Sequence, residues 1–391
     1  MSYLVIHSKF DKENILCVTV SNISKLKLKN FKICFSLIYS ITSINNAKII
    51  KNIGRYYEVS QLRTKKIHDK WKFKIKLQKN KYNIYNISSG IQGVFCIDEN
   101  EKFIKLKHNI LRFYKPVKEK EYIKISKKNV KISIIPEPKN YKVGTKIVNF
   151  TKGFSIRNMI VKNNFKKIRK IIGKNKYFFE KFDGLNVMLI KKNLKKEEYK
   201  LEIKSDLVKI YSKSETGVFY ALVSILQIAN SGNGHVKECF IHDSPKFLWR
   251  GMHLDCARQF YSVKQIIKLL NFMAIFKLNR FHWHLTDNEA WRLDLKCYPN
   301  LAKDLSFRGY DLKVPPTYGG GIGPTGGIYK KKDIIKILNY AKSLCIEVMP
   351  EIDLPAHSWA LVSNFGKLQE KNDLSWENVK DGYLNNTINP A

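Results

Sequence analysis

Apolar and polar positions alternate with a period close to two through the first 115 residues. Short apolar runs separated by polar breaks occur in the segments ILCVTVSN, FKICFSLIYSI, KWKFKIKL and GVFCID. A period of two places apolar side chains on one face of a strand, so the pattern predicts an N-terminal antiparallel β-sandwich over residues 1–115. The stretch contains no catalytic cluster, and the lysine-rich segment 116–129 that follows is typical of a linker.

Residues 130–245 mix strand and helix patterns. The segments KFDGLNVMLIKK and YKLEIKSDLVKIYS predict strands, and VKISIIPEPKNYKV is expected to begin with a strand and a proline-containing turn. The segment SETGVFYALVSILQIANSG predicts a buried helix, because Ser and Glu open it and Asn-Ser-Gly closes it. We therefore expect an α+β domain without visible chemistry.

From residue 246 onward, strands and helices alternate. The order is a strand GMHLDCA, a helix that begins near Ser262, a strand RFHWHLTD, a glycine-rich insertion, a helix over 331–344 and a strand IEVMPEIDL. This rhythm predicts parallel strands of a TIM (β/α)8 barrel. Because the sequence ends at Ala391 after three such strands, we expect an incomplete barrel over residues 246–391 of a multidomain chain.

The charge of the chain admits two interpretations. It carries 71 basic and 33 acidic residues, a formal net charge of +38, which would suit a protein that binds nucleic acid. The excess is mostly lysine spread along the chain, however, and arginine, the preferred residue for phosphate and base recognition, is scarce. We favour lysines on solvated faces and expect no nucleic-acid partner.

Other features bear on the compartment. The N-terminal residues lack a basic segment followed by an apolar core, and the longest apolar run, near 218–229, is too short to span a membrane. The seven cysteines never form a CxxC pair, which fits a reducing compartment. These features favour a cytoplasmic location without a membrane span.

Functional side chains are expected where the barrel strands end. Arg258 follows the first strand, Asp287 ends the second, and Asp353 and His357 follow the third. The carboxyl ends of parallel barrel strands meet at one face, so these four residues are expected to converge. Together they offer donors and acceptors for the hydroxyl groups of a sugar. The competing interpretation is that Arg258 merely pairs with a core carboxylate.

The motifs RGMHLDCARQFY, FHWHLTDNEAWR and PEIDLPAH closely resemble the first part of the catalytic barrel of glycoside hydrolase family 20, the β-N-acetylhexosaminidases. Residues 130–245 resemble the α+β domain that precedes this barrel, and residues 1–115 are more weakly similar to the β-sandwich of some bacterial members. The resemblance implies a hydrolase that removes terminal N-acetylglucosamine or N-acetylgalactosamine from oligosaccharides. It implies no cofactor and no metal, and leaves the oligomeric state open.

The resemblance also implies substrate-binding roles for the four residues. Arg258 matches the arginine that binds hydroxyls of the terminal amino sugar. Asp287 matches a pocket aspartate that helps to set the catalytic acid, and Asp353 and His357 match the polar pair near that acid. The sequence departs from the usual family pattern at positions that are not principal pocket residues, namely Gln259, Asn288, Glu289 and Ala356.

The mechanism implied by the family is substrate-assisted retaining hydrolysis. The acetamido oxygen of the substrate attacks the anomeric carbon, a glutamate acts as acid and then base, and the adjacent aspartate orients the acetamido group. Family members carry this Asp-Glu pair after a Gly-Gly on the next barrel strand, and no such motif occurs between His357 and Ala391. We therefore expect no catalytic residue within this sequence and the pair beyond Ala391. The alternative is an inactive truncated relative, poorly soluble by itself, with at most a carbohydrate-binding function.

Three other groups admit competing interpretations. His282 and His284 point to one face of a strand and could bind a metal, but without a third ligand we favour packing. Glu351 and Asp353, about 6–7 Å apart if both lie on one strand, could be mistaken for a glycosidase acid pair; the resemblance makes them structural and pocket residues. For Cys256 we favour a buried thiol over a nucleophile.

Overall fold

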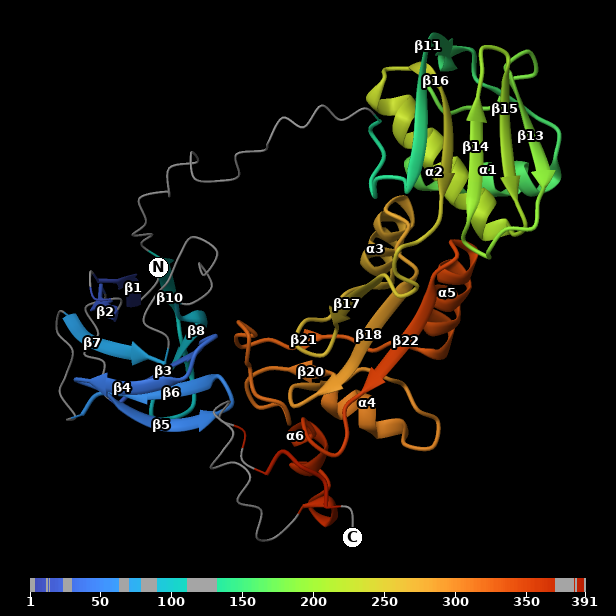
Figure 1. Ribbon diagram of the computed structural model, residues 1–391. Coiled ribbons are helices and arrows are strands. Elements are labelled where there is room, and N and C mark those ends of the chain that lie inside the picture. Colours follow the sequence, from blue (N-terminus) through green and yellow to red (C-terminus); the bar gives the residue numbers. More distant parts are fainter. Residues whose placement is uncertain are drawn as a thin grey trace.

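Figure 1 shows the computed structural model of the chain. The structure describes residues 4–11, 13, 15–23, 30–62, 70–78, 90–110, 132–369, 383 and 385–389. The predicted linker 116–129 lies outside the described residues.

The N-terminal residues form two five-stranded sheets. The first has the order β10-β1-β2-β7-β4, with β10 (Leu106–Ile110), β1 (Leu4–Phe10), β2 (Leu16–Asn22), β7 (Lys70–Leu77) and β4 (Ile41–Asn45). The second has the order β5-β6-β3-β8-β9, with β5 (Lys48–Ile53), β6 (Tyr56–Ser60), β3 (Lys32–Ser36), β8 (Gln92–Ile97) and β9 (Phe103–Ile104). One hydrophobic core contains buried side chains of both sheets, including Phe73 of β7 and Ile33 of β3. The residues of β7 are alternately exposed and buried, so its alternating polar and apolar residues determine which face of the strand packs against the core.

The apolar run FKICFSLIYSI does not form one strand. Its first part is β3 and its last residues begin β4, and these two strands belong to different sheets. The chain bends over residues 37–40, where the backbone N–H of Leu37 donates to the carbonyl oxygen of Arg55. A bend of this kind lets a chain cross from one sheet to the other without leaving the core.

Residues 140–243 form a mixed sheet with two helices. The strand order is β11-β16-β14-β15-β13-β12, with β11 (Asn140–Asn149), β16 (His235–Asp243), β14 (Tyr199–Ile203), β15 (Leu207–Ser212), β13 (Leu185–Lys191) and β12 (Phe154–Ile156). The helices α1 (Met159–Ile172) and α2 (Glu215–Ser231) pack against each other and against the sheet, and a short 3-10 helix spans Phe150–Lys152. Strand pairs β12·β13 and β13·β15 are parallel, and the others are antiparallel.

The helix α2 has the predicted ends. The side chain of Ser214 accepts a hydrogen bond from the backbone N–H of Gly217, and Gly232 follows the last turn. Twelve of the seventeen residues of α2 are buried, because the sheet covers one side and the barrel residues cover another. At the barrel side, Gln227 Nε2 donates to the carbonyl oxygen of Ile275 over 2.7 Å.

The predicted strand at the start of VKISIIPEPKNYKV is wrong for the described residues 132–139, since the first strand begins at Asn140. Pro136 and Pro138 lack the N–H that a strand ladder needs. The backbone N–H and C=O of Ile135 instead bond to the side chain of Gln227, at 2.6 and 2.9 Å. A helix side chain thus replaces a neighbouring strand as the hydrogen-bonding partner of this segment.

The C-terminal residues contain three parallel strands in the order β17-β18-β22, which lie between the N-terminal sheets and the mixed sheet in Figure 1. They are β17 (Gly251–Asp255), β18 (Arg280–Asp287) and β22 (Glu347–Ile352), and the connecting helices are α3 (Val263–Ile275) and α5 (Lys331–Ser343). Ser262 caps α3, as predicted, through a reciprocal pair of hydrogen bonds with Gln265.

The insertion between β18 and α5 contains β19 (Ala290–Trp291), α4 (Pro299–Leu305), β20 (Phe307–Arg308) and β21 (Thr325–Gly326). After β22 come α6 (Trp359–Val362) and a 3-10 helix, Gly366–Leu368. Among the described residues, no helix has the length and apolar character needed to cross a membrane.

The N-terminal sheets contact this insertion directly. The ring of Tyr310 lies 5.5 Å, between centroids, from both Phe95 and Phe103, and its hydroxyl donates to Glu101. Farther along the insertion, the backbone N–H of Gly319 donates to Ser36 Oγ over 2.6 Å. The strands at the start of the chain therefore support a loop of the barrel.

Candidate active site

The three parallel strands bring their carboxyl ends side by side. In the pairing register, Asp255 of β17 lies beside His284 of β18, and His284 lies beside Glu351 of β22. The chain leaves β17 through a tight turn, in which Asp255 Oδ1 accepts the backbone N–H groups of Ala257 and Arg258. This turn directs the Arg258 side chain back across the ends of the strands.

Arg258 lies among three carboxylates. Its Nη1 is 2.6 Å from Asp287 Oδ2 and 3.0 Å from Asp255 Oδ2, and its Nε donates to Glu289 Oε2 over 2.9 Å. Burial lowers the pKa of the guanidinium, but the charges of Glu289, Asp287 and Asp255 outweigh this effect and raise it. Arg258 is therefore permanently charged and held in one orientation.

Asp287 is the most connected of these carboxylates. Its side chain is only 1% exposed and accepts hydrogen bonds from His284 Nε2 at 2.9 Å, His357 Nδ1 at 3.1 Å and its neighbouring backbone N–H at Asn288. Burial raises the pKa of Asp287, but the His284 hydrogen bond and the Arg258 charge overcome this and hold it below the usual value. Asp287 is thus a charged residue at the centre of this cluster, and its hydrogen bonds orient the neighbouring side chains.

His357 and Asp353 complete the group of four predicted residues. His357 Nδ1 is 3.4 Å from Arg258 Nη2, and its backbone has a φ of 54°, in the left-handed region that histidine adopts more readily than most residues. The acceptor and donor atoms of Asp287, Asp353 and His357 lie within 4.8 Å of one another. The structure therefore brings together Arg258, Asp287, Asp353 and His357, which are far apart in sequence.

Glu289 is a site residue whose role was not predicted. It is 1% exposed and pairs with Arg258. Burial raises its pKa above the usual range; the charge of Arg258 opposes that effect and the charge of Asp287 adds to it. The available signal was a glutamate two residues after the strand-ending aspartate, directly before the apolar pair Ala290–Trp291.

The insertion supplies two further neighbours that have no sequence signal. Arg308 donates to the carbonyl oxygen of Arg258, and its guanidinium carbon is 5.6 Å from the ring centroid of Tyr318. Burial lowers the pKa of Arg308, although the charge of Glu289 opposes this. These contacts join the insertion to Arg258 and its neighbours, and they depend on tertiary packing that periodicity does not encode.

Cys256 and the Glu351–Asp353 pair are the remaining candidates for a catalytic role. Cys256 is fully buried and accepts a hydrogen bond from Trp283 Nε1 at 3.2 Å, and burial raises the pKa of its thiol, as for an inert buried cysteine. Asp353 lies just beyond β22, which ends at Ile352, and a carboxylate oxygen of Asp353 is within 4.8 Å of one of Glu351. Burial and the nearby charge of Glu351 raise the pKa of Asp353, although His284 opposes them.

The exposure of the side chains decides which of them can meet a ligand. The side chains of Arg258 and His357 are 28% and 49% exposed, whereas that of Asp287 is 1% exposed. Arg258 and His357 can therefore donate hydrogen bonds to a polar ligand, while Asp287 fixes their positions from below. Such a fixed array of donors suits a ligand with several hydroxyl groups.

Comparisons with known proteins place the chain in a family. The model described as "Glycosyl hydrolase family 20, catalytic domain" matches residues 247–391, and the model described as "Glycosyl hydrolase family 20, domain 2" matches residues 131–244. Together the two matches extend over about two thirds of the chain. The chain belongs to glycosyl hydrolase family 20. The family resemblance expected from the three barrel motifs is confirmed.

Similar proteins include a β-hexosaminidase of Vibrio furnissii, 35% identical over 49% of this chain and 32% of the relative. An N,N'-diacetylchitobiase of Vibrio harveyi is 39% identical over 42% of this chain and 20% of the relative. The crystal structure of a family 20 exo-β-N-acetylglucosaminidase from Vibrio harveyi has the same fold, with a TM-score of 0.81 at 23% identity, over 99% of this chain and 63% of that one. The chain thus spans about a third or less of the two curated relatives. Its fold is multidomain with a TIM-barrel-like domain.

Proposed function

We propose that this chain carries the amino-sugar recognition residues of a β-N-acetylhexosaminidase, which removes terminal N-acetylglucosamine or N-acetylgalactosamine from oligosaccharides. The observation that carries the proposal is the fixed position of Arg258 between Asp287 and Glu289, within a chain of family 20. The named activities of the similar proteins, β-hexosaminidase and chitobiase, agree with it.

In the proposed complex, Arg258 donates two hydrogen bonds to hydroxyl groups of the terminal sugar. Its guanidinium is already oriented by three carboxylates, so little side-chain entropy is lost on binding. His357, oriented by Asp287, lies beside the acid of the reaction, and Asp353 completes the polar wall. Hydrolysis is substrate-assisted: the acetamido oxygen of the sugar attacks the anomeric carbon, and the Asp-Glu pair of the family mechanism serves the acetamido group and the leaving oxygen.

The proposed organisation is a β-sandwich over residues 1–115, an α+β domain over 130–245 and the first part of the catalytic TIM barrel over 246–391. The shared core of the two N-terminal sheets and the parallel order β17-β18-β22 support this division.

The first test measures the binding of N-acetylglucosamine to the chain by isothermal titration calorimetry. Glucose, which lacks the acetamido group, is the comparison ligand. Arg258→Gln is expected to weaken binding by about ten- to a hundredfold, because each hydrogen bond to a charged donor contributes about 1.5–3 kcal/mol. The matched control is Arg280→Gln. Arg280 has the same side-chain exposure, 28%, but lies at the opposite end of β18, paired with Glu347. Equal losses in both variants would refute the assignment of Arg258.

The second test is hydrolysis of an aryl N-acetyl-β-glucosaminide. It is measured with the protein as its gene produces it. Sugar binding without hydrolysis would leave carbohydrate recognition as the function, and absence of both would refute the proposal.

A further inference from the structure

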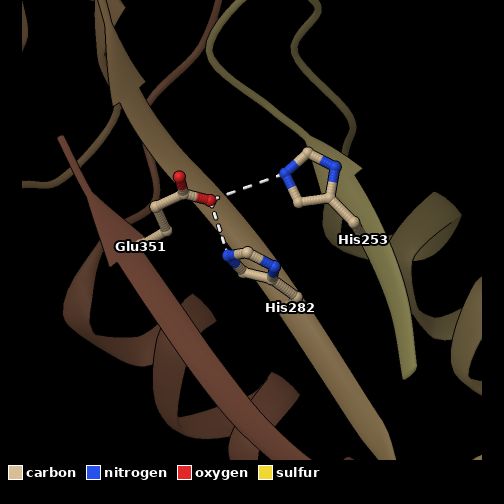
Figure 2. A group of neighbouring side chains, drawn as sticks. All are labelled: His253, His282 and Glu351. Carbon is tan, nitrogen blue, oxygen red and sulfur yellow. Dashed lines mark ion pairs between the residues drawn. The ribbon is translucent and has the colours of Figure 1, made fainter. Parts of the chain in front are cut away.

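Three histidines surround one glutamate on the three parallel strands, next to the residues around Arg258. His253 of β17 is directly opposite His282 of β18 in the register, and His284 of β18 is opposite Glu351 of β22. Figure 2 shows His253 and His282 directed toward the same carboxylate of Glu351. The sequence indicated the two histidines of β18 but not the partners on the adjacent strands.

The three imidazoles converge on a single oxygen. Glu351 Oε2 is 2.6 Å from His282 Nε2, 2.8 Å from His284 Nδ1 and 3.5 Å from His253 Nε2. Despite these short distances, Glu351 Oε2 and His284 Nδ1 are buried and find no partner with hydrogen-bond geometry among the described residues. Buried polar atoms in folded proteins are almost always satisfied, so this pair calls for an explanation.

The hydrogen bond on the other side of His284 makes the conflict sharper. Its Nε2 donates to Asp287 Oδ2 over 2.9 Å. In the neutral ring, Nδ1 then carries a lone pair that points at the Glu351 carboxylate. Two acceptors would then face each other, whereas a proton on Nδ1 turns this contact into a hydrogen bond. An ion at Glu351 Oε2 would therefore be held by His253 and His282.

We propose that His253 Nε2, His282 Nε2 and Glu351 Oε2 bind a divalent transition-metal ion of the zinc class. The three atoms come from three adjacent strands and lie within 4.8 Å of one another. Ligand atoms about 2.0–2.2 Å from a tetrahedral metal lie roughly 3.3–3.6 Å apart. His253 Nε2, 3.5 Å from Glu351 Oε2, already has this spacing, whereas His282 Nε2, at 2.6 Å, would have to move away by somewhat less than about 1 Å. Two imidazoles and a carboxylate form a ligand set typical of zinc, and it leaves one coordination position open.

His284 acts as a positioning residue in this arrangement. It bonds to Asp287 and lies against the ligand Glu351, so it links the metal ion to Arg258 and its neighbours. Outer residues of this kind orient a metal ligand without touching the ion. The metal site and the proposed sugar site therefore stand on different residues of the same strands, and neither proposal requires the other.

In the test, the chain is titrated with Co²⁺ and binding is monitored by visible absorption. A second titration, with Zn²⁺, is monitored by calorimetry. We expect the chain to bind one equivalent of Co²⁺ and to show its ligand-field bands. We expect no near-ultraviolet thiolate band, which would appear if Co²⁺ bound a cysteine such as the exposed Cys297. His282→Gln and Glu351→Gln should each weaken binding more than about tenfold. His253→Gln, at a half-exposed position, provides a third variant with little risk to folding.

The matched control is His242→Gln. His242 Nε2 is 2.6 Å from Glu198 Oε1, the same separation as in the His282–Glu351 pair, but no metal-ligand group of the described residues includes it. Its loss should leave metal affinity unchanged. The proposal is overturned if the wild-type chain binds neither ion, which would leave a shared proton as the explanation, or if His282→Gln and His253→Gln bind both ions as well as the wild type.

Discussion

Asp287→Asn changes one atom at the centre of the candidate active site, and its cost follows from the contacts of Asp287. The carboxylate is 1% exposed and accepts from Arg258 at 2.6 Å, His284 at 2.9 Å and His357 at 3.1 Å. Asparagine has no charge to pair with Arg258. Its amide NH₂ group is itself a donor, so it would face one of the donors that now bond to Asp287. Breaking a buried ion pair from one side costs about 3–5 kcal/mol, so we expect the free energy of unfolding to fall by that amount.

The assay is urea unfolding followed by tryptophan fluorescence, since Trp283 is buried in the same strand. The control is Asp304→Asn: Asp304 pairs with Lys313 at 2.7 Å, but its side chain is 35% exposed, so the expected cost is below about 1 kcal/mol. Because the folded-state pKa of Asp287 is lowered, its contribution is present at neutral pH and is lost as the pH falls below about 3.9. Equal costs for the two variants, or a cost that does not shrink in acid, would show that Asp287 is not the charged residue at the centre of the cluster.

Three other changes test neighbouring features. Ser262→Ala removes the cap of α3 and should cost about 1 kcal/mol of unfolding free energy, measured by chemical denaturation. Glu289 has a raised folded-state pKa, so its contribution is present in acid and is lost as the pH rises above about 4.3; Glu289→Gln should abolish this loss in a pH series of urea midpoints. Tyr310→Ala removes the ring packed on Phe95 and should speed proteolytic cleavage of the insertion, whereas Tyr298→Ala, at a 61% exposed ring, should not.

The sequence predicted the barrel elements well because their signals are local. The strand RFHWHLTD matches β18 residue for residue, and the capping residues Ser262 and Ser214 lie where two helices begin. A helix cap involves residues three or four positions apart, so a short window contains all its information. The same holds for the polar residues that follow each strand, whose convergence needs only the rule that parallel strands share a carboxyl end.

The partners of these residues were not predictable in the same way. Arg258 and Glu289 are separated by 31 positions, and His282 and Glu351 meet only because β18 and β22 are adjacent in a particular register. The false strand before Asn140 has a similar cause, since its backbone bonds to Gln227, 92 positions away. Each of these contacts depends on tertiary packing, which overrides local preference and leaves no periodic trace.

One line of contacts joins the proposed sugar-binding residue Arg258 to the proposed metal ligand Glu351, through Asp287 and His284. An ion bound between His253 and Glu351 would shift this carboxylate, and the change would reach Asp287 through His284, which contacts both carboxylates. If that shift changes the affinity of the proposed sugar site for N-acetylglucosamine by some factor, the sugar must change the affinity for the ion by the same factor, because coupling between two equilibria is reciprocal. Titration of N-acetylglucosamine with and without the ion measures this factor: a changed sugar affinity shows that the two sites are coupled, and an unchanged affinity shows that they are independent.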